Sequence, residues 1–196
     1  MKGEYITIFR RKRERKTDYK KRRAAVVSKL PLLNVFLSSK YVYAHIVKPE
    51  VQGDKIISSA NSQQLRRLGW MGSGKSIPAC YLTGLLLAKR TKLTDMNDVI
   101  VYTGMLGYRS GSRIAAVVKG AKDGGLKVLA DEESFPGDER ISGKHISDYA
   151  NALKNRDENL YLSKFSARLN AGLRPENIQE HFQLIKQKIL ELPKNE

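Results

Sequence analysis

Residues 69–76 have the spacing G-x-x-x-x-G-K-S, which is the pattern of a phosphate-binding P-loop. That chemistry requires a buried strand just before the loop, so that backbone N–H groups converge on the phosphates. Residues 62–68 are instead polar and helix-like, bulky Trp70 follows the first glycine, and no apolar strand ends in an aspartate that could hold magnesium. We therefore interpret residues 72–75 as a flexible glycine-rich loop whose Lys75 contacts a phosphate group. A P-loop-like nucleotide-binding protein remains the alternative.

A second loop, residues 104–113, follows an apolar segment and precedes a helical pattern. A helix N-terminus offers backbone donors and a favourable dipole to an anion, and Arg109 and Arg113 add positive charge. The glycine spacing is not G-x-G-x-x-G, which argues against a dinucleotide. The loop suits a phosphate of an RNA backbone, and an ordinary strand-to-helix turn is the alternative.

The remaining reactive side chains form no catalytic constellation. His45, His145 and His181 lie far apart, without spaced cysteine or carboxylate partners, so we expect no metal site. Many of the acidic residues cluster near residues 131–139, where solvation accounts for them. No nucleophile is paired with a base. The sequence thus predicts a protein that is not an enzyme and has neither a cofactor nor a small-molecule substrate.

Positive charge dominates the composition: 36 lysines and arginines against 20 acidic residues give a net charge of +16. The balance favours a polyanionic partner, either nucleic acid or an acidic membrane surface. Residues 1–30 alone carry twelve basic and three acidic side chains. We expect residues 10–16 to be extended or disordered in isolation, with a short helix capped by Thr17 after them. An arm that folds onto nucleic-acid phosphates is favoured over a localisation signal or a solubilising tail.

The most apolar run, residues 77–88, is too short to span a bilayer, which needs about 20 residues. The Ser76 cap and Pro78 in the first turn indicate a buried helix instead, in which Cys80 has a packing role. A single cysteine gives no disulfide framework. Because nothing resembles a signal peptide, we expect a cytoplasmic protein.

Around this helix the pattern predicts three strands that form an antiparallel meander, an inner strand, a second helix that ends at Gly124-Gly125, and an edge strand. The strands are expected at residues 32–39, 41–47, 55–60, 98–103 and 126–129. Alternation places aliphatic residues on the face that covers the helix. The other face carries aromatic and polar groups, which either stack RNA bases or are merely half-exposed; these are Asn34, Phe36, Ser38, Tyr41, Tyr43 and His45.

An acidic connector follows Ala130, and three helical patterns come after it at residues 143–154, 159–169 and 175–192. This tail is expected to wrap over the core or to lie on a neighbouring molecule. We thus predict an α/β protein with a mixed sheet, an antiparallel three-strand meander plus a parallel strand, and helices packed on one face. Its parts are a basic RNA-binding arm (1–30), an α/β core (31–130) and a helical C-terminal extension (131–196).

Several strings together resemble the family of universal large-subunit ribosomal protein eighteen, in its archaeal and eukaryotic form. They cover most of residues 10–150 in the family's order, with an echo at Glu180-His181-Phe182. The strings are KTDYKKRR (16–23), SSKYVYA (38–44), SANS (59–62) with Gly69-Trp70, PACYLTGLL (78–86), GSR (111–113), GAKDGGL (120–126) and RISGKHI (140–146). The chain departs from the family pattern at Phe36 and Tyr43, where the family has basic side chains, and residues 72–75 lie where the family is variable.

The resemblance implies a non-enzymatic constituent of the large ribosomal subunit. Such a protein binds 5S rRNA, joins it to large-subunit rRNA in the central protuberance and meets neighbouring large-subunit ribosomal proteins there, without a membrane. A non-specific nucleic-acid chaperone is a further alternative. With Lys75, the expected RNA-contacting residues are Arg10, Arg11, Lys12, Arg13, Arg15, Lys16, Thr17, Tyr19, Lys20, Arg22, Arg23, Ser38, Ser39, Lys40, Tyr41, Arg109, Ser110, Ser112, Arg113, Arg140, Lys144 and His145.

Overall fold

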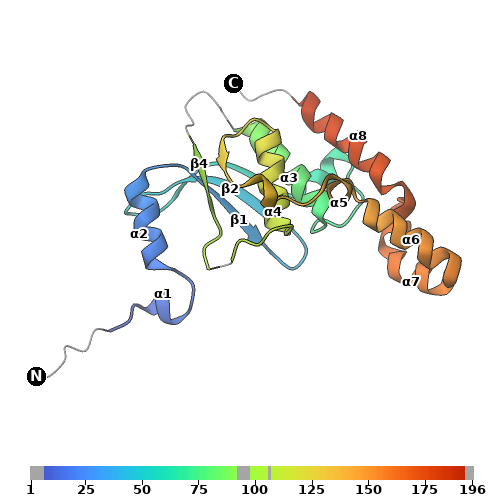
Figure 1. Cartoon of the computed structure of the whole chain (residues 1–196), viewed down its shortest axis with the longest axis horizontal. Coiled ribbons are helices and arrows are strands. Elements are labelled where there is room, and N and C mark those ends of the chain that lie inside the picture. The colour runs from blue at the N-terminus through green and yellow to red at the C-terminus, as the bar shows by residue number, and fades with distance from the viewer. Residues whose placement is uncertain (1–6, 92–97, 106, 193–196) are drawn as a thin grey trace, which may run out of the picture.

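The computed structural model describes residues 7–91, 98–105 and 107–192, and these build a five-stranded mixed sheet in the order β3-β2-β1-β4-β5 (Figure 1). The β1/β2 and β2/β3 pairs are antiparallel, whereas β1/β4 and β4/β5 are parallel, which confirms the predicted meander with an inner parallel strand. The strands are β1 (Leu32–Leu37), β2 (Val42–Lys48), β3 (Lys55–Asn61), β4 (Val99–Tyr102) and β5 (Val128–Leu129).

Two helices, α3 (Ile77–Arg90) and α4 (Arg113–Asp123), pack on one face of the sheet. The face that alternation assigns to them is buried, from Leu33 and Val35 to Ile46. A third helix, α8 (Ile178–Glu191), lies on α3, where the rings of Phe182 and Tyr81 are 5.7 Å apart between centroids. The apolar run is therefore covered on several sides, as its composition predicted, and the tail wraps over the core.

Helices α3 and α4 approach each other unusually closely because a glycine faces the partner backbone on each side. A Cβ atom at Gly84 would overlap the carbonyl oxygen of Val117, and one at Gly120 would overlap that of Tyr81. The helices run parallel, so their N-termini lie side by side beyond the carboxyl ends of β1 and β4. Ser76 and Ser112 cap these termini by accepting the N–H of Ala79 and of Ala115.

The basic arm is more ordered than its charge suggests. Residues 10–16 are not extended: α1 (Arg10–Arg13) forms one turn, in which Glu14 neutralises part of the local charge by pairing with Arg10 and Lys16. Thr17 is also not the helix cap. The side chain of Asp18 caps α2 (Tyr19–Ser28) by accepting the N–H groups of Lys20 and Lys21, because its carboxylate is the stronger acceptor at that position.

The arm faces Asn34 and Phe36, on the sheet face opposite α3 and α4, across a cavity. Arg22 holds it there by pairing with Asp54 and by donating to the carbonyl oxygen of Glu50 at 2.9 Å. Figure 1 shows α1 and α2 at one end of the molecule and the helical extension at the other. None of the helices among the described residues is long and apolar enough to cross a membrane.

The extension contains α5 (Asp138–Ser142), α6 (Lys144–Arg156) and α7 (Glu158–Leu169), followed by a short 3-10 turn η3 (Pro175–Asn177) that leads into α8. Further 3-10 turns are η1 (Gln64–Leu68), within the segment that looked helix-like in the sequence, and η2 (Glu132–Ser134). Helices α6 and α7 pack as a hairpin around a small core of their own, formed by Ala150, Leu153, Tyr161 and Phe165.

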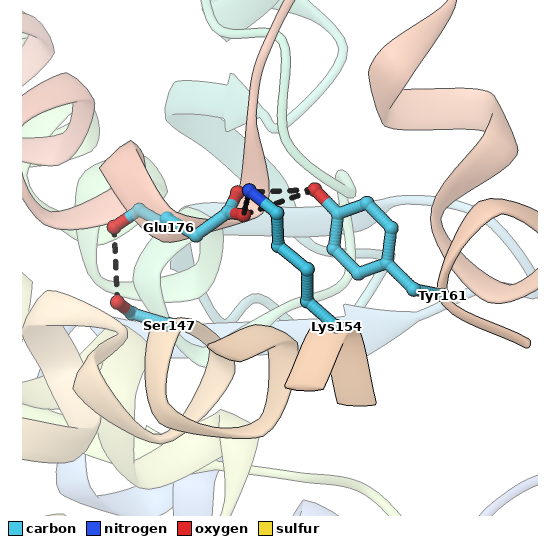
Figure 2. A network of polar contacts seen from close by, with 4 residues as sticks. All are labelled: Ser147, Lys154, Tyr161 and Glu176. Atoms are coloured by element: carbon cyan, nitrogen blue, oxygen red, sulfur yellow. Dashed lines mark hydrogen bonds and ion pairs between the residues drawn. The ribbon is translucent and has the colours of Figure 1, made fainter. Parts of the chain in front are cut away.

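A polar network fastens this hairpin to the start of α8. Figure 2 shows Lys154 and Tyr161 directed at the carboxylate of Glu176, while Ser147 donates to its backbone oxygen at 2.9 Å. Burial alone would raise the pKa of Glu176, but hydrogen bonds from its own backbone, Tyr161 and Lys154 outweigh that effect and lower the pKa. The network therefore links α6, α7 and η3 through one half-buried carboxylate.

Candidate nucleic-acid interface

Three segments that the sequence singled out meet in one cavity of about 460 Å³ at the N-termini of α3 and α4. The glycine-rich loop contributes Lys75, the loop before α4 contributes Arg109 and Arg113, and the extension contributes Arg140 and His145. None of the described residues that line the cavity is acidic. We call this set of five basic residues the helix-end pocket. Its charge and the adjacent helix N-termini favour an anion such as a phosphate group.

Ser110 and Ser112, in the loop before α4, make local hydrogen bonds within the chain. The hydroxyl of Ser110 donates to the carbonyl oxygen of Glu133 at 3.3 Å, and Gly111 donates its N–H to that of Ser134. Ser112 is occupied as the cap of α4. These bonds tie the loop to η2 and hold Arg109 and Arg113 over the pocket. Leu106 of the loop lies outside the described residues, as do residues 1–6 of the arm.

The titration behaviour of His145 depends on the charges around it. Partial desolvation lowers the pKa of His145, the nearby Arg140 and Arg168 lower it further, and Asp148 opposes them. A bound phosphate would act in the opposite direction by favouring the imidazolium form. Lys144, the neighbouring candidate, does not line the pocket; it pairs with Glu139 at 2.7 Å, and this hydrogen bond raises the pKa of Lys144.

The β1–β2 hairpin tip adjoins this pocket. The hydroxyl of Ser38 donates to the carbonyl oxygen of Tyr41 and accepts the N–H of Tyr41, both at 2.9 Å, and so closes the turn. Ser39 and Lys40 are exposed. Gly74 packs against Tyr41 and the backbone of Lys40, so the tip and the glycine-rich loop form one continuous surface.

A second cavity, of about 840 Å³, separates the arm from the open face of the sheet. The arm lines it with Arg11, Arg15, Lys16, Thr17, Tyr19 and Arg22. The other predicted arm residues, Arg10, Lys12, Arg13, Lys20 and Arg23, are exposed outside it. Leu37 lines both cavities, which makes the helix-end pocket and the arm cavity neighbours.

Comparison with known proteins identifies the family. A family model described as "Ribosomal large subunit proteins 60S L5, and 50S L18" matches residues 4–105. The large ribosomal subunit protein uL18 of Caldivirga maquilingensis is 43% identical over 190 residues, which span 96% of this chain and 92% of that protein. The uL18 protein of Thermofilum pendens is 41% identical over 189 residues, 96% of each chain. This chain belongs to the uL18 family.

Proteins of the uL18 family are structural constituents of the large ribosomal subunit, not enzymes. The P-loop pattern at residues 69–76 is therefore coincidental, and the local structure shows why. Gly69 ends the 3-10 turn η1 in a left-handed conformation, so a 3-10 turn and not a strand leads directly into the loop. Trp70 is buried, stacks on His181 with ring centroids 5.1 Å apart, and donates its indole N–H to the carbonyl oxygen of Ser73. The loop is thus built around a tryptophan.

Arg168, which the sequence did not single out, is a further basic residue near the helix-end pocket. Arg168 lies over the ring of Phe165, 5.5 Å from its centroid, and its charge reaches His145 at the rim of the helix-end pocket. Its Nη1 is buried and has no hydrogen-bond partner among the described residues, and burial lowers the pKa of Arg168. Nothing in the helical pattern of residues 159–169 distinguished this arginine from a solvated one.

Proposed function

We propose that this chain binds 5S rRNA and attaches it to large-subunit rRNA in the central protuberance of the ribosome. In this proposal the arm (1–30) and the extension (131–196) flank the core (31–130), and neighbouring ribosomal proteins complete the site. The chain acts as a scaffold without turnover. Membership of the uL18 family and the net charge of +16 support the proposal.

The observation that carries the proposal is the helix-end pocket, where five basic side chains from three segments surround two capped helix N-termini. Phosphate oxygens fit such a site because they accept hydrogen bonds from arginine and from backbone N–H groups. Phosphate contacts give affinity, whereas the position of each contact on a rigid body selects the shape of a folded RNA. The arm, the hairpin tip and the pocket would then engage one RNA together.

Competition binding tests the RNA preference. The full chain is titrated with labelled 5S rRNA in the presence of tRNA or duplex DNA at physiological salt. We expect 5S rRNA to be retained against an excess of either competitor, because its fold presents phosphates in the matching arrangement. Equal competition by random duplex would instead indicate a non-specific nucleic-acid chaperone.

A double variant, Arg109→Ala with Arg113→Ala, tests the pocket. We expect it to weaken 5S rRNA binding by at least about tenfold, since each charge-assisted contact contributes roughly 1 kcal/mol or more. The matched control, Arg156→Ala with Arg174→Ala, removes the same charge from exposed positions outside the pocket and should bind nearly as the parent does. If both variants lose affinity equally, net charge and not the pocket drives binding.

A further inference from the structure

The arm cavity has two walls of different chemistry. The arm wall is cationic, with Arg11, Arg15 and Lys16, whereas the sheet wall presents Phe36, Tyr102 and the amide of Asn34. We propose that this cavity binds one unpaired RNA nucleotide, with its base on the Phe36 side and its phosphate on the arm. The inference deepens the proposed function, because it adds recognition of a base to the binding of phosphates.

The register of β1 with its neighbouring strands determines which side chains form the sheet wall of the cavity. Asn34 pairs with Tyr102 across the parallel β1/β4 ladder, and Phe36 pairs with Tyr43 across the antiparallel β1/β2 ladder. All four side chains therefore stand on the same face, away from α3 and α4. Phe36 is 56% exposed, and the centroid of its ring lies 6.2 Å from that of Tyr43. An apolar ring is thus displayed beside half-buried aromatic and amide groups.

The arm wall is held in place by contacts within the arm and by contacts to the β2–β3 loop. Arg11 donates to the hydroxyl of Thr17 at 2.8 Å, and Arg15 takes a left-handed backbone conformation (φ 50°) that turns the chain between α1 and α2. The rings of Phe9 and Tyr19 close the same turn, with centroids 5.1 Å apart. Because Arg22 anchors α2 to the β2–β3 loop, the cavity exists in the free chain and does not have to be created by its ligand.

Charge and shape narrow the class of ligand. Among the described residues that line the cavity, Asp54 is the only carboxylate, and it is already paired with Arg22. Lys16 is paired with Glu14, so Arg11 and Arg15 supply the surplus positive charge, and this charge disfavours a purely apolar occupant. A bare phosphate would gain nothing from Phe36, whereas a base stacks on such a ring. At about 840 Å³ the cavity lies within the size range of small-molecule sites and admits a whole nucleotide.

The base must be unpaired. In an RNA duplex the faces of the bases are stacked on one another, and an aromatic side chain reaches them only in loops, bulges and ends. The proposed ligand is therefore a nucleotide that the RNA turns out of its helix, with its neighbouring phosphates on the exposed cations of α1. The helix-end pocket, which shares Leu37 with this cavity, would take phosphates further along the same strand.

The test uses the full chain with two probes, single-stranded oligoadenylate and inorganic polyphosphate, which differ in the presence of bases. We expect Phe36→Leu, which keeps apolar bulk but removes the planar ring, to weaken oligoadenylate binding by about tenfold, the range measured for loss of one stacked base. Polyphosphate affinity and the salt dependence of binding should be unchanged. The control Ile56→Ala truncates an equally exposed residue (58%) of the same sheet outside the cavity and should change neither.

A rescue variant, Phe36→Trp, should retain oligoadenylate affinity, and its indole fluorescence should be quenched by oligoadenylate but not by polyphosphate. The native Trp70 is buried and gives a constant background. Unchanged oligoadenylate binding by Phe36→Leu, or equal losses for both probes, would overturn the inference. The competition assay with 5S rRNA is scored separately, so a failure of the proposed function and a failure of the base site are distinguishable.

Discussion

His181 joins the C-terminal helix to the glycine-rich loop through a nitrogen that must stay unprotonated. The Nε2 atom accepts the N–H of Met71 at 3.1 Å, and the ring stacks on Trp70. Burial lowers the pKa of His181 below its ordinary value of 6.5, and Lys188 lowers it further. A protonated ring could not accept the Met71 hydrogen bond. The contact therefore links the position of α8 to the acidity of the solution.

The sign of this linkage gives a prediction. Below about pH 6.5 an unfolded chain takes up a proton on His181 while the native chain does not, so the unfolded state binds more protons. We expect the free energy of unfolding, measured with urea, to be level near pH 7.5 and to fall as the pH drops from 6.5 toward the lowered native pKa. His181→Phe keeps the ring contact and should show a smaller acid loss. An identical acid loss in the variant would assign the effect to other groups.

At the level of single residues, the sequence could indicate basic residues that stand beside a local signal, but not those whose surroundings depend on tertiary packing. Lys75, Arg109 and Arg113 could be chosen because each follows a glycine-rich loop or adjoins a helix start, which are local signals. Arg168 could not, because its neighbours come from tertiary packing. The cap of α2 was misassigned to Thr17 because Thr17 and Asp18 both satisfy the pattern, and only geometry selects the carboxylate.

The contact between α3 and α4 depends on two glycines, and its disruption is measurable. Gly120→Ala would place a methyl group against the Tyr81 carbonyl oxygen, a backbone atom that cannot move aside alone. We expect the free energy of unfolding to fall by about 1–3 kcal/mol, the usual cost of overpacking, after a gain of up to about 1 kcal/mol in helix propensity.

Gly137→Ala is the matched control, because a Cβ atom there meets nothing within 4 Å. It should leave the free energy of unfolding nearly unchanged. An equally stable Gly120→Ala variant would mean that the two helices separate without cost. The helix-end pocket would then not require their present spacing.

At the scale of elements, periodicity was a reliable guide wherever a segment has one buried face. The alternation in β1 and β2, the apolar run of α3 and the stripe of α8 each reflect burial against the core, and the predicted elements agree with the observed ones. The arm has no such face, so its turn of helix at Arg10–Arg13 was missed. There the decisive interactions are ion pairs with Glu14 and the ring contact between Phe9 and Tyr19.

Across the whole molecule, the arm cavity and the helix-end pocket are neighbours that share Leu37, and Gly74 joins the hairpin tip to the glycine-rich loop. If the basic residues of the arm, the tip and the pocket together neutralise about 8 phosphates, the duplex coefficient gives a log–log salt slope near −7, and the single-strand coefficient gives less. Titration of 5S rRNA at several salt concentrations measures the slope. A shallow value, on the order of −2, would contradict joint binding by arm and body.

The overall arrangement of the arm and extension was beyond the reach of the sequence. Residue patterns could place a helical tail after residue 130 but could not say that α8 returns to α3 while the α6–α7 hairpin projects from the opposite end to the arm. The position of α8 depends on which apolar stripe it packs against, as the contact between Phe182 and Tyr81 shows. Matching of this kind is a property of pairs of distant segments.

The parallel orientation of α3 and α4 affects the electrostatic energy of the core. Antiparallel helices attract each other through their dipoles, whereas two helices that point the same way bring like partial charges together at both ends. Lys75, Arg109 and Arg113 intensify that opposition at the N-terminal end. A bound polyanion neutralises this repulsion, so the core should become more rigid when the protein binds RNA. The free chain should then unfold more easily than the RNA-bound chain.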